Sequence, residues 1–346
     1  MLFLLRIADN ICIMVILITG ASSGIGYEAA KMLAAKGHKV YAAARRTELL
    51  EPLKADGIVP VKLDVTDETS CQDCVRTVSQ AEGRIDALVN NAGYGYLGPI
   101  ECVPLQDAHT QIRTNLLGMA CLCKLVIPFM REQKSGRIVN ISSVAGQAPV
   151  LFGGWYNISK YGVEALSDNL RIELKPFGIK VIKIEPGGIK TPWGGIAADH
   201  LEECTSGTVY SASASREATL LRMGYNGSLL APPSTAARAI CRAVITKRPR
   251  ARYRPGSGAS FLVAAHAILP LRWWDRLVSV MFLQDRASRV SSAAISISDT
   301  EEQYVNGGLV TYCARTCIGD YIYTAKPDEM KMVDKIICEE LGIARS

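Results

Sequence analysis

The sequence predicts an α/β fold, a doubly wound parallel sheet in a single domain with a C-terminal extension. The first observation is that short apolar runs alternate with segments of helical periodicity, as in parallel β-α-β units. The second is a glycine-rich turn, Thr19–Gly26, which joins the apolar run Met14–Ile18 to a helical pattern over Tyr27–Lys36. In such folds ligands bind beyond the carboxyl ends of the strands.

Each predicted strand is a short apolar run bounded by turn residues. Helices of suitable length separate the strands, among them Pro104–Gln133 and Trp155–Lys175, and the second is stopped by Pro176 and Gly178. The expected strands are Met14–Ile18, Lys39–Ala44, Val59–Leu63, Ala87–Asn90, Arg137–Ile141 and Lys180–Ile184, with Ala251–Arg254 as a candidate seventh.

Two later segments are harder to assign. Periodicity weakens from Thr191 to about Leu230, where we expect a mobile segment that covers the ligand crevice. Ala259–Leu283 is apolar and carries two tryptophans and two arginines. We favour a helix that packs on the sheet or lines an apolar pocket, and the alternative is an amphipathic helix in peripheral contact with a membrane.

The domain boundaries follow from composition. We expect residues 14–285 to form the main domain and residues 286–346 a C-terminal extension of unknown role that ends in a helix starting near Pro327. Residues 1–13 are an apolar N-terminal extension, interrupted by Arg6 and Asp9 well before the ~20 residues that a transmembrane span requires. We therefore expect no transmembrane span there, and a folded protein without these residues.

The charge and the cysteines narrow the class of protein. Much of the net charge of +6 lies in Lys247–Arg254, which we interpret as a solvated loop or edge, with an anionic membrane surface as the alternative partner. No aromatic platform accompanies it, so we expect no nucleic-acid partner. Eleven cysteines without a framework suit a reducing, cytoplasmic location. We expect no metal site, because Cys71 and Cys74 have no second pair and the four histidines lack ligand spacing.

The glycine turn has the parts of a phosphate cradle. Gly20 allows a sharp turn, and Gly24 and Gly26 remove side chains where a pyrophosphate must come close to the backbone. The helix that follows points free N–H groups at the phosphates. The same turn also matches G-x-S-x-G, so a serine hydrolase that uses Ser22 is an alternative. Its context opposes this, since the turn follows the very first strand and no oxyanion-hole motif is present.

Catalytic chemistry is suggested by Tyr156 and Lys160, which the four-residue spacing places on one face of a predicted helix. An ammonium group and a bound nicotinamide ring could together lower the pKa of the phenol enough for proton transfer to or from a carbonyl oxygen. Ser143 follows a buried strand upstream and could polarise the same oxygen. Tyr27 and Lys31 have the same spacing without such a serine.

With these motifs in order, residues 14–255 resemble the short-chain dehydrogenase/reductase family, which has a Rossmann fold. The resemblance implies a catalytic tetrad of Asn115, Ser143, Tyr156 and Lys160. Asn115 would hold a water in a proton relay, and Lys160 would bind the nicotinamide ribose. Asp64 would meet the adenine, and Thr191 the carboxamide. The implied cofactor-binding set is Gly20, Ser22, Ser23, Gly24, Ile25, Gly26, Arg45, Arg46, Asp64, Val65, Asn91, Ala92, Gly93, Asn115, Tyr156, Lys160, Pro186, Gly187, Ile189 and Thr191.

The end of the second strand indicates which dinucleotide binds. NAD(H) preference usually places an acidic residue there, on the ribose diol. Here the strand ends in Ala44-Arg45-Arg46, and two guanidinium groups can grip a 2′-phosphate. We therefore predict NADP(H), with Arg45 as the main contact, and NAD(H) remains the alternative.

The substrate is predicted only as a class. The motifs resemble the branch of the family with 17β-hydroxysteroid and retinol dehydrogenases, which implies a small-molecule ketone or secondary alcohol, bulky and apolar. An apolar wall near the site would be formed by Val150, Leu151, Phe152, Trp155 and Trp193. A non-catalytic NADPH-binding or sensing protein is the alternative function. The resemblance also implies a homo-oligomer, formed through the helices that carry Asn115 and Tyr156.

Overall fold

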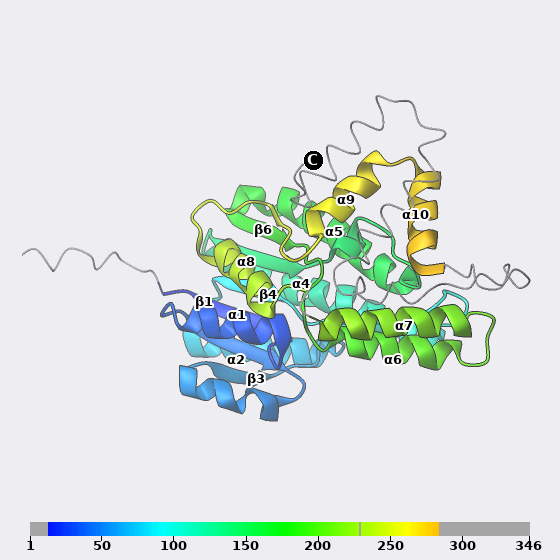
Figure 1. The fold of residues 1–346 in the computed structure, drawn as a ribbon. Coiled ribbons are helices and arrows are strands. Elements are labelled where there is room, and N and C mark those ends of the chain that lie inside the picture. The colour runs from blue at the N-terminus through cyan, green and yellow to red at the C-terminus, as the bar shows by residue number, and fades with distance from the viewer. Residues whose placement is uncertain (1–12, 228–229, 284–346) are drawn as a thin grey trace, which may run out of the picture. The chain divides into compact units, whose positions relative to one another are not determined.

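The computed structural model describes residues 13–227 and 230–283 and contains a seven-stranded sheet in the order β3-β2-β1-β4-β5-β6-β7 (Figure 1). All six strand pairings are parallel. The α/β fold and the candidate seventh strand are thereby confirmed. The strands are β1 (Val15–Thr19), β2 (Lys39–Ala44), β3 (Val59–Lys62), β4 (Ala87–Asn90), β5 (Gly136–Ile141), β6 (Ile179–Ile184) and β7 (Arg252–Tyr253).

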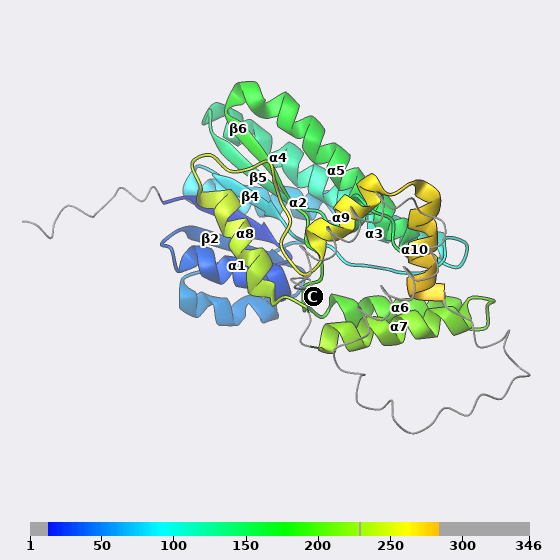
Figure 2. The ribbon, with the colours of Figure 1, turned by 45° about the horizontal axis from the view of Figure 1, so that its top comes forward.

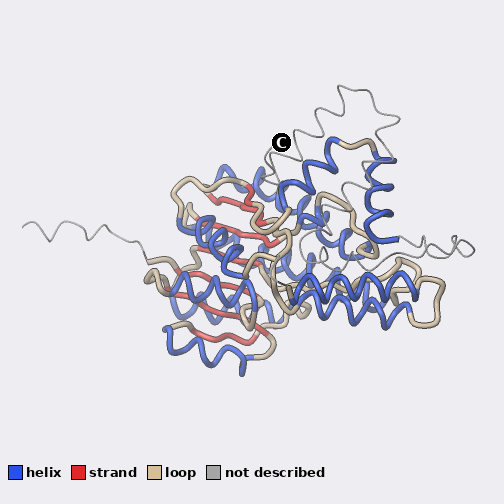
Figure 3. Tube along the Cα trace, viewed as in Figure 1, coloured by secondary structure: helices blue, strands red, loops and turns tan. Residues whose placement is uncertain are grey.

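Helices cover both faces of the sheet, as Figure 3 shows by colour. Strand β1 explains why: Ile16 and Ile18 belong to the core on one face, and Val15 and Leu17 to the core on the other. A parallel strand buried on both sides must be apolar throughout. The first face carries α1 (Gly24–Ala34) and α8 (Pro233–Ile245), and the second carries α2 (Glu68–Glu82), α4 (Gly118–Glu132) and α5 (Gly154–Leu174).

The sheet has a topological switch point beside β1. This strand pairs with β2 on one side and with β4 on the other. Chain connections therefore leave β1 and β4 in opposite directions, which opens a crevice at their carboxyl ends. Thr19 ends β1 and Asn90 ends β4, so the glycine turn and the Asn91–Gly93 loop meet at this crevice.

The segment predicted as one helix over Pro104–Gln133 is interrupted. It forms α3 (Leu105–Ile112), a π-helical turn η2 (Arg113–Leu117) and then α4. Extra-residue turns of this kind are frequent at functional sites, and Asn115 lies in this one. The run Leu105–Glu132 is long and apolar enough to cross a membrane by length and composition. In this fold, however, Leu122, Val126 and Met130 of α4 pack into the core under the sheet, which accounts for that composition.

Two helices that periodicity did not reveal follow β6: α6 (Trp193–Thr205) and α7 (Ser211–Asn226), which lie side by side (Figures 1 and 2). Their contact uses small residues, including Ala197, Ala198, Ala214 and Ala218. Alanine is a strong helix former but a weak marker of an apolar face, so the sequence pattern looked irregular. The expected cover over the crevice is therefore helical.

The remaining elements are short or peripheral. The 3₁₀ segments are η1 (Thr47–Asp56), η3 (Val144–Gly146) and η4 (Lys175–Phe177). The single helix expected over Ala259–Leu283 is instead two, α9 (Ala259–Ile268) and α10 (Leu271–Leu283), because Pro270 cannot continue the first. One compact unit reaches to Ala264 and a second begins at Ala265. Residues 1–12 of the N-terminal extension and all of 286–346, with the predicted terminal helix, lie outside the described residues.

Candidate active site

Three predicted catalytic side chains meet at the carboxyl end of β5. Ser143 follows this strand, and its hydroxyl accepts a hydrogen bond from the N–H of Ala145 (3.1 Å) and hydrogen-bonds Tyr156. Tyr156 lies in the first turn of α5, and Lys160 follows one turn later, with its ammonium nitrogen 5.8 Å from the centre of the Tyr156 ring. Lys160 donates a hydrogen bond to the carbonyl of Ile141 (3.0 Å). The helical spacing therefore brings the two groups together as predicted.

Burial dominates the electrostatics of this pair. Burial raises the pKa of Tyr156 to about 12, and the hydrogen bond with Ser143 acts in the opposite direction. Burial also lowers the pKa of Lys160 to about 8, while the charge of Glu164 acts to raise it. The protein groups alone thus favour the neutral phenol at pH 7, which is the form that can donate a proton to a carbonyl oxygen.

Asn115 supports the loop between β4 and α3 rather than lying free in a helix. Its Oδ1 accepts a hydrogen bond from the N–H of Tyr94 (3.0 Å), and its Nδ2 donates to the carbonyl of Tyr94 (2.9 Å) and to Ser159 Oγ (3.0 Å). Asn115 is completely buried, so these bonds satisfy groups that would otherwise be costly to bury. It connects the loop to α5, next to Lys160.

Glycines allow the cofactor loops to approach one another. Gly20 has a positive φ of 64°, and a Cβ atom there would lie 2.7 Å from Cα of Ala92. A Cβ atom at Gly26 would lie 2.7 Å from the carbonyl of Gly20 and would displace Asn91, whose Nδ2 bonds the carbonyls of Thr19 and Gly20. No side chain fits at either glycine without moving backbone.

The Asn91–Gly93 loop is also close to the catalytic groups. A Cβ atom at Gly93 would lie 3.0 Å from Asn115 Oδ1 and 3.7 Å from Lys160 Nζ. The N–H groups of Asn91 and Ala92 both donate to the Thr19 hydroxyl at the end of β1. Val65 and Ala92 line one small hollow together with Thr19 and Asn90. These contacts place the predicted loop residues at the switch point.

The start of α1 faces the same crevice. Gly24, at a φ of 59°, begins this helix, and a Cβ atom there would lie 3.4 Å from Thr191 Cγ2. Ser23 is exposed and its side chain makes no cap hydrogen bond, Ser22 is half-buried, and Ile25 packs against the core. The first N–H groups of the helix therefore point into a space bordered by the segment that follows β6.

Hydrogen bonds from residues distant in the sequence hold the Pro186–Thr191 segment in place. The carbonyl of Pro186 accepts from the N–H of Val144 (3.1 Å), and the N–H of Gly187 donates to the carbonyl of Pro255 (2.9 Å). Ile189 is buried and pairs with Ala231. This segment therefore links the Ser143 loop to α8 and β7, a contact between distant parts of the chain that spacing alone does not show.

Basic and acidic side chains lie where the adenosine end of a dinucleotide is expected. Arg45 and Arg46 follow β2 and are exposed, and Asp64 follows β3, the next strand in the sheet. Burial would raise the pKa of Asp64, but hydrogen bonds from Thr66 and the charges of Arg45 and Arg113 outweigh it and hold the pKa below its ordinary value. Arg45 and Asp64 are therefore neighbours, although they are 19 residues apart in the sequence.

An apolar wall borders Tyr156, with a composition that differs from the prediction. Leu151, Phe152 and Trp193 belong to the same cluster as Tyr156, as expected. Trp155 belongs to a different cluster, with Tyr94 and Tyr96, and Val150 is in neither. Leu97, Leu221 and Tyr225, which no sequence pattern singled out, also belong to this wall. The last of these lies 5.8 Å from Trp193, ring centre to ring centre.

The alternatives considered from the sequence lack structural support. Burial raises the pKa of the Cys71 and Cys74 thiols to about 12, so these residues are inert packing groups on the buried face of α2. Among the described residues no cluster of metal-binding side chains occurs. Within the described ranges, 13–227 and 230–283, no hydrogen bond joins Ser22 to a histidine; His38 accepts from the N–H of Met14, and His200 stacks on Tyr96.

Residues 14–200, more than half of the chain, match the sequence pattern of the family described as short chain dehydrogenase. The chain belongs to the short-chain dehydrogenase/reductase family. It is 35% identical over 266 residues to a probable short-chain type dehydrogenase/reductase, VdlC, of Helicobacter pylori, covering 77% of this chain and 97% of that protein. It is also 35% identical to a 3-ketodihydrosphingosine reductase of Bacteroides thetaiotaomicron, covering 72% and 90%. Human retinol dehydrogenase 16 is 42% identical over 51% of this chain and 57% of that protein.

Solved structures agree with this assignment. A short-chain dehydrogenase from Streptomyces avermitilis superimposes with a TM-score of 0.64 at 32% identity, covering 80% of this chain and 98% of that one. A serine dehydrogenase in complex with NADP+ superimposes with a TM-score of 0.60 at 27% identity, covering 70% and 94%. The chain is therefore an oxidoreductase of this family with a Rossmann-type fold.

Proposed function

We propose that this protein is an NADP(H)-dependent oxidoreductase that interconverts a ketone and a secondary alcohol, with Tyr156 as the general acid and base. The observation that carries the proposal is the hydrogen-bonded group Ser143–Tyr156, with Lys160 one helical turn away, at the carboxyl ends of the strands beside the glycine turn. This geometry supports the proposal, because a proton donor, a hydrogen-bond donor for the substrate oxygen and a phosphate cradle would then share one crevice.

The residues present fit a dinucleotide. The N-terminus of α1 offers free N–H groups and a partial positive charge to a pyrophosphate, and Gly24 leaves room beside Thr191. Thr191 and the Asn91–Gly93 loop would hold the nicotinamide end. When bound, the cofactor supplies or accepts the hydride at the substrate carbon.

The proton steps belong to the protein. In ketone reduction, the Tyr156 hydroxyl donates its proton to the carbonyl oxygen while Ser143 stabilises the negative charge that develops there. In alcohol oxidation, the Tyr156 phenolate removes the hydroxyl proton. The Lys160 ammonium group stabilises that phenolate. We assign to Asn115 a water that relays the proton, and Asn115 also holds the neighbouring loop in position.

A bulky apolar substrate fits the residues around Tyr156. Leu97, Phe152 and Trp193 belong to its cluster, and Tyr225 packs on Trp193 from α7. Because apolar side chains near a reacting group favour apolar ligands, we propose a substrate of the kind exemplified by steroids and retinoids. Two relatives support this class: one is named for 3-ketodihydrosphingosine and the other for retinol.

The cofactor preference rests on charge. Among the described residues, the end of β2 presents Arg45 and Arg46 and no carboxylate. A guanidinium group can bind a 2′-phosphate through two parallel hydrogen bonds. A similar solved structure holds NADP+, which supports the same choice.

We also propose a homo-oligomer formed through α5. This helix leaves Ile158, Tyr161 and Ile172 exposed on its outer side, and Leu117 of η2 is exposed as well. Scattered apolar residues are normal on a surface, but several on one long helix favour an interface. Sedimentation velocity of the wild type and of Ile172→Glu tests this, and a wild-type monomer would contradict it.

Tyr156→Phe tests the catalytic proposal, and Tyr27→Phe is its matched control. Both tyrosines precede a lysine by four residues, but only Tyr156 hydrogen-bonds Ser143. Turnover is followed by NADPH absorbance with a panel of ketones and alcohols. We expect Tyr156→Phe to lose at least 1,000-fold in kcat/KM (~4 kcal/mol) and Tyr27→Phe to remain active. Cofactor binding by a wild type that turns over no member of the panel would favour the sensing alternative instead.

A further inference from the structure

A second carboxylate lies close to the proposed catalytic pair. Glu164 follows Lys160 by one turn on α5, so both project from the same side of the helix. Glu164 is 8% exposed and Lys160 is 6% exposed. The mechanism described above makes no use of this residue. A buried carboxylate one helical turn from a buried ammonium group acts on it, because little water screens the field.

Three partners hold the Glu164 carboxylate in place. Its Oε2 lies 2.6 Å from Lys183 Nζ and accepts a hydrogen bond from Gln147 Nε2 (2.9 Å), with an Arg252 guanidinium nitrogen at 3.7 Å. Lys183 is 3% exposed and lies on β6. Glu164 and Lys183 thus form a buried ion pair. The negative charge beside Lys160 is therefore built into the fold.

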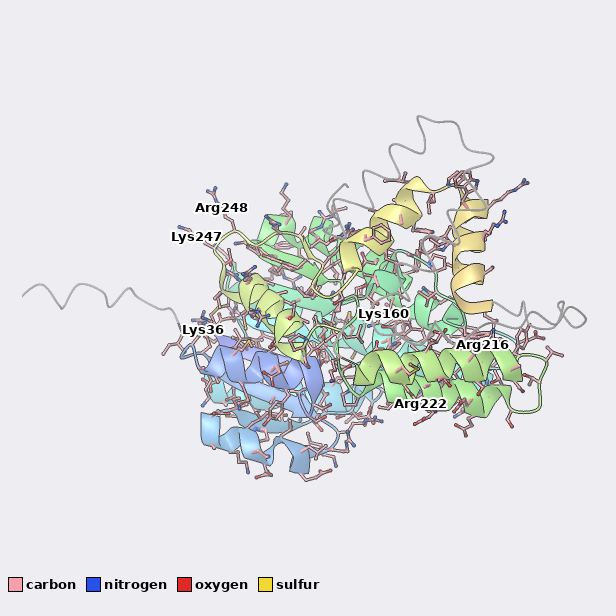
Figure 4. All side chains as sticks on the ribbon, viewed as in Figure 1. Lys36, Lys160, Arg216, Arg222, Lys247 and Arg248 are labelled. Carbon is pink, nitrogen blue, oxygen red and sulfur yellow. The ribbon has the colours of Figure 1, made fainter. Side chains whose placement is uncertain are left out.

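The basic stretch Lys247–Arg254 takes part in the same network, which corrects its interpretation as a solvated edge. Lys247 and Arg248 do reach outward (Figure 4). Arg252 and Arg254, in contrast, pair with Glu185 at 2.5 Å and 2.8 Å, and Glu185 is completely buried. Strand β7 and the residue after it thereby place Arg252 and Arg254 at the sheet edge next to β6, close to Glu164 and Glu185.

The other oxygen of Glu164 is unpaired within the described residues. Oε1 is buried and has no hydrogen-bond partner. The Ser142 hydroxyl is likewise buried without a partner among these residues. Gly146 explains how the carboxylate fits there, since a Cβ atom would lie 2.9 Å from the Lys160 carbonyl and 3.0 Å from Glu164 Cγ. An oxygen left unpaired in this way costs stability, so stability alone does not account for the carboxylate.

We propose that Glu164 is a positioning residue whose buried charge keeps Lys160 in its ammonium form and thereby sets the pH range in which the Tyr156–Lys160 pair transfers a proton. The inference rests on the proposed catalytic role of Lys160. Burial favours the neutral amine, and the charge of Glu164 opposes it. An ammonium group is what stabilises the Tyr156 phenolate, so Glu164 acts on Tyr156 through Lys160.

The charged and polar groups around this pair come from several elements. On α5 they are Tyr156 and Asp168. From the other elements packed there they are Asn115 of η2, Ser143 before η3 and Gln147 after it, Lys183 of β6 and Glu185 after it, and Arg252 of β7 with Arg254 after it. The charge that acts to raise the pKa of Lys160 is that of Glu164 itself.

Glu164→Gln is the decisive variant, because it removes the charge and keeps the shape. Removing a nearby negative charge eases loss of the ammonium proton from Lys160. We therefore expect the high-pH midpoint of the kcat–pH profile, at which the ammonium form is lost, to move to lower pH by about one unit. Unchanged midpoints in a folded Glu164→Gln enzyme would overturn the proposal.

Asp168→Asn is the matched control. Asp168 also pairs with Lys183 (2.9 Å), but it lies two turns beyond Lys160 on α5. If Glu164 were only a partner for Lys183, both variants would lower the melting temperature and leave the pH profile alone. We expect only Glu164→Gln to move the profile. An equal movement in Asp168→Asn would also contradict the proposal.

A readout without turnover separates this inference from the proposed function. The ¹³Cε NMR signal of Lys160 is assigned by its loss in Lys160→Arg and is followed against pH in the cofactor complex. Its titration midpoint should be about one pH unit lower in Glu164→Gln than in the wild type. If the wild type is inactive but the Lys160 midpoint still differs in this way between wild type and Glu164→Gln, only the proposed function is contradicted. If Glu164→Gln does not fold, Glu164→Gln/Lys183→Gln removes one charge of each sign. A smaller downward movement is expected there, because the Lys183 charge that partly offsets Glu164 is lost as well, and its absence overturns the proposal.

Discussion

The indole ring of Trp193 lies 5.3 Å from the phenol ring of Tyr156, centre to centre, at an angle of 53°. Trp193 is the first residue of α6, and Gly95 lies directly against its ring, where any side chain would clash. The start of this helix therefore covers the proposed proton donor with an aromatic surface. We therefore expect Trp193 to influence the size and polarity of the substrate.

Trp193→Leu is expected to raise KM for a bulky apolar ketone about tenfold, because it removes aromatic surface from the substrate wall. KM for a small ketone should change by less than threefold. Trp155→Leu is the control, since Trp155 packs in a different cluster, with Tyr94 and Tyr96. Steady-state kinetics with the two ketones measures the effect. Equal changes for both ketones in Trp193→Leu would show that the residue does not sort substrates.

Arg45→Asp is expected to reverse the cofactor preference. Losing a charge-assisted pair with a 2′-phosphate costs about 1.5–3 kcal/mol, which corresponds to a rise in KM for NADPH of roughly 10- to 100-fold. KM for NADH should change little or fall. Arg46→Asp is the neighbouring control, with a smaller effect expected. An unchanged ratio of the two Michaelis constants in Arg45→Asp would refute the NADP(H) assignment.

Gly26→Ala is expected to weaken both folding and cofactor binding. The new methyl group would meet the Gly20 carbonyl and displace Asn91 from its two hydrogen bonds, at a cost of about 2 kcal/mol. Gly195→Ala is the control in α6, where no atom lies within 4 Å of the added carbon. It should stabilise the helix by up to about 1 kcal/mol. Urea unfolding and cofactor fluorescence titration report both effects.

Glu217 of α7 is expected to make the protein less stable at alkaline pH. Burial raises the pKa of this carboxyl to about 7, and its Oε2 has no hydrogen-bond partner among the described residues. Its neutral form stabilises the fold fully below pH ~4.5, and that contribution is lost as the pH rises through about 7. At pH 8 the free energy of unfolding of Glu217→Gln, measured with urea, should therefore exceed that of the wild type by up to about 3 kcal/mol. At pH 4.5 the two values should be similar.

Glu202 of α6 is expected to affect stability with the opposite pH dependence to Glu217. The hydrogen bond from Arg222 holds the pKa of Glu202 below its ordinary value. Glu202→Gln should consequently lower stability at neutral pH and have less effect near pH 4. Parallel melts of the two variants at both pH values test the pair of predictions. A Glu217→Gln variant that is less stable than the wild type at pH 8 would show that the carboxylate is needed in the fold.

Much of the fold could be predicted from local patterns. The strands appeared as short apolar runs because a parallel sheet covered on both faces needs apolar residues at every position, as Ile16 and Leu17 show. The helix α5 was predicted nearly to its ends, since Pro176 and Gly178 stop it. In contrast, α6 and α7 pack through alanines, whose weak apolar signal hides the periodicity.

The interrupted helix shows a different limit. Leu105–Glu132 has helical periodicity throughout, and no proline or glycine lies within the π-helical turn Arg113–Leu117, although Gly118 follows it directly. Asn115 bonds the backbone of Tyr94 and the hydroxyl of Ser159 there, both distant in the sequence. Interactions between remote segments determine such a break, so no local pattern could predict it.

By itself the sequence determined the alternation of strands and helices, the glycine turn and the helical spacing of Tyr156 and Lys160. These features depend on the order of neighbouring residues, and the backbone periods convert that order into geometry. Only the tertiary structure decided that Arg45 lies near Asp64, that Tyr225 packs on Trp193, and that Arg252 reaches the carboxylate beside Lys160. Each of these relations joins segments far apart in the chain, and the packing of one sheet between two layers of helices brings them into contact.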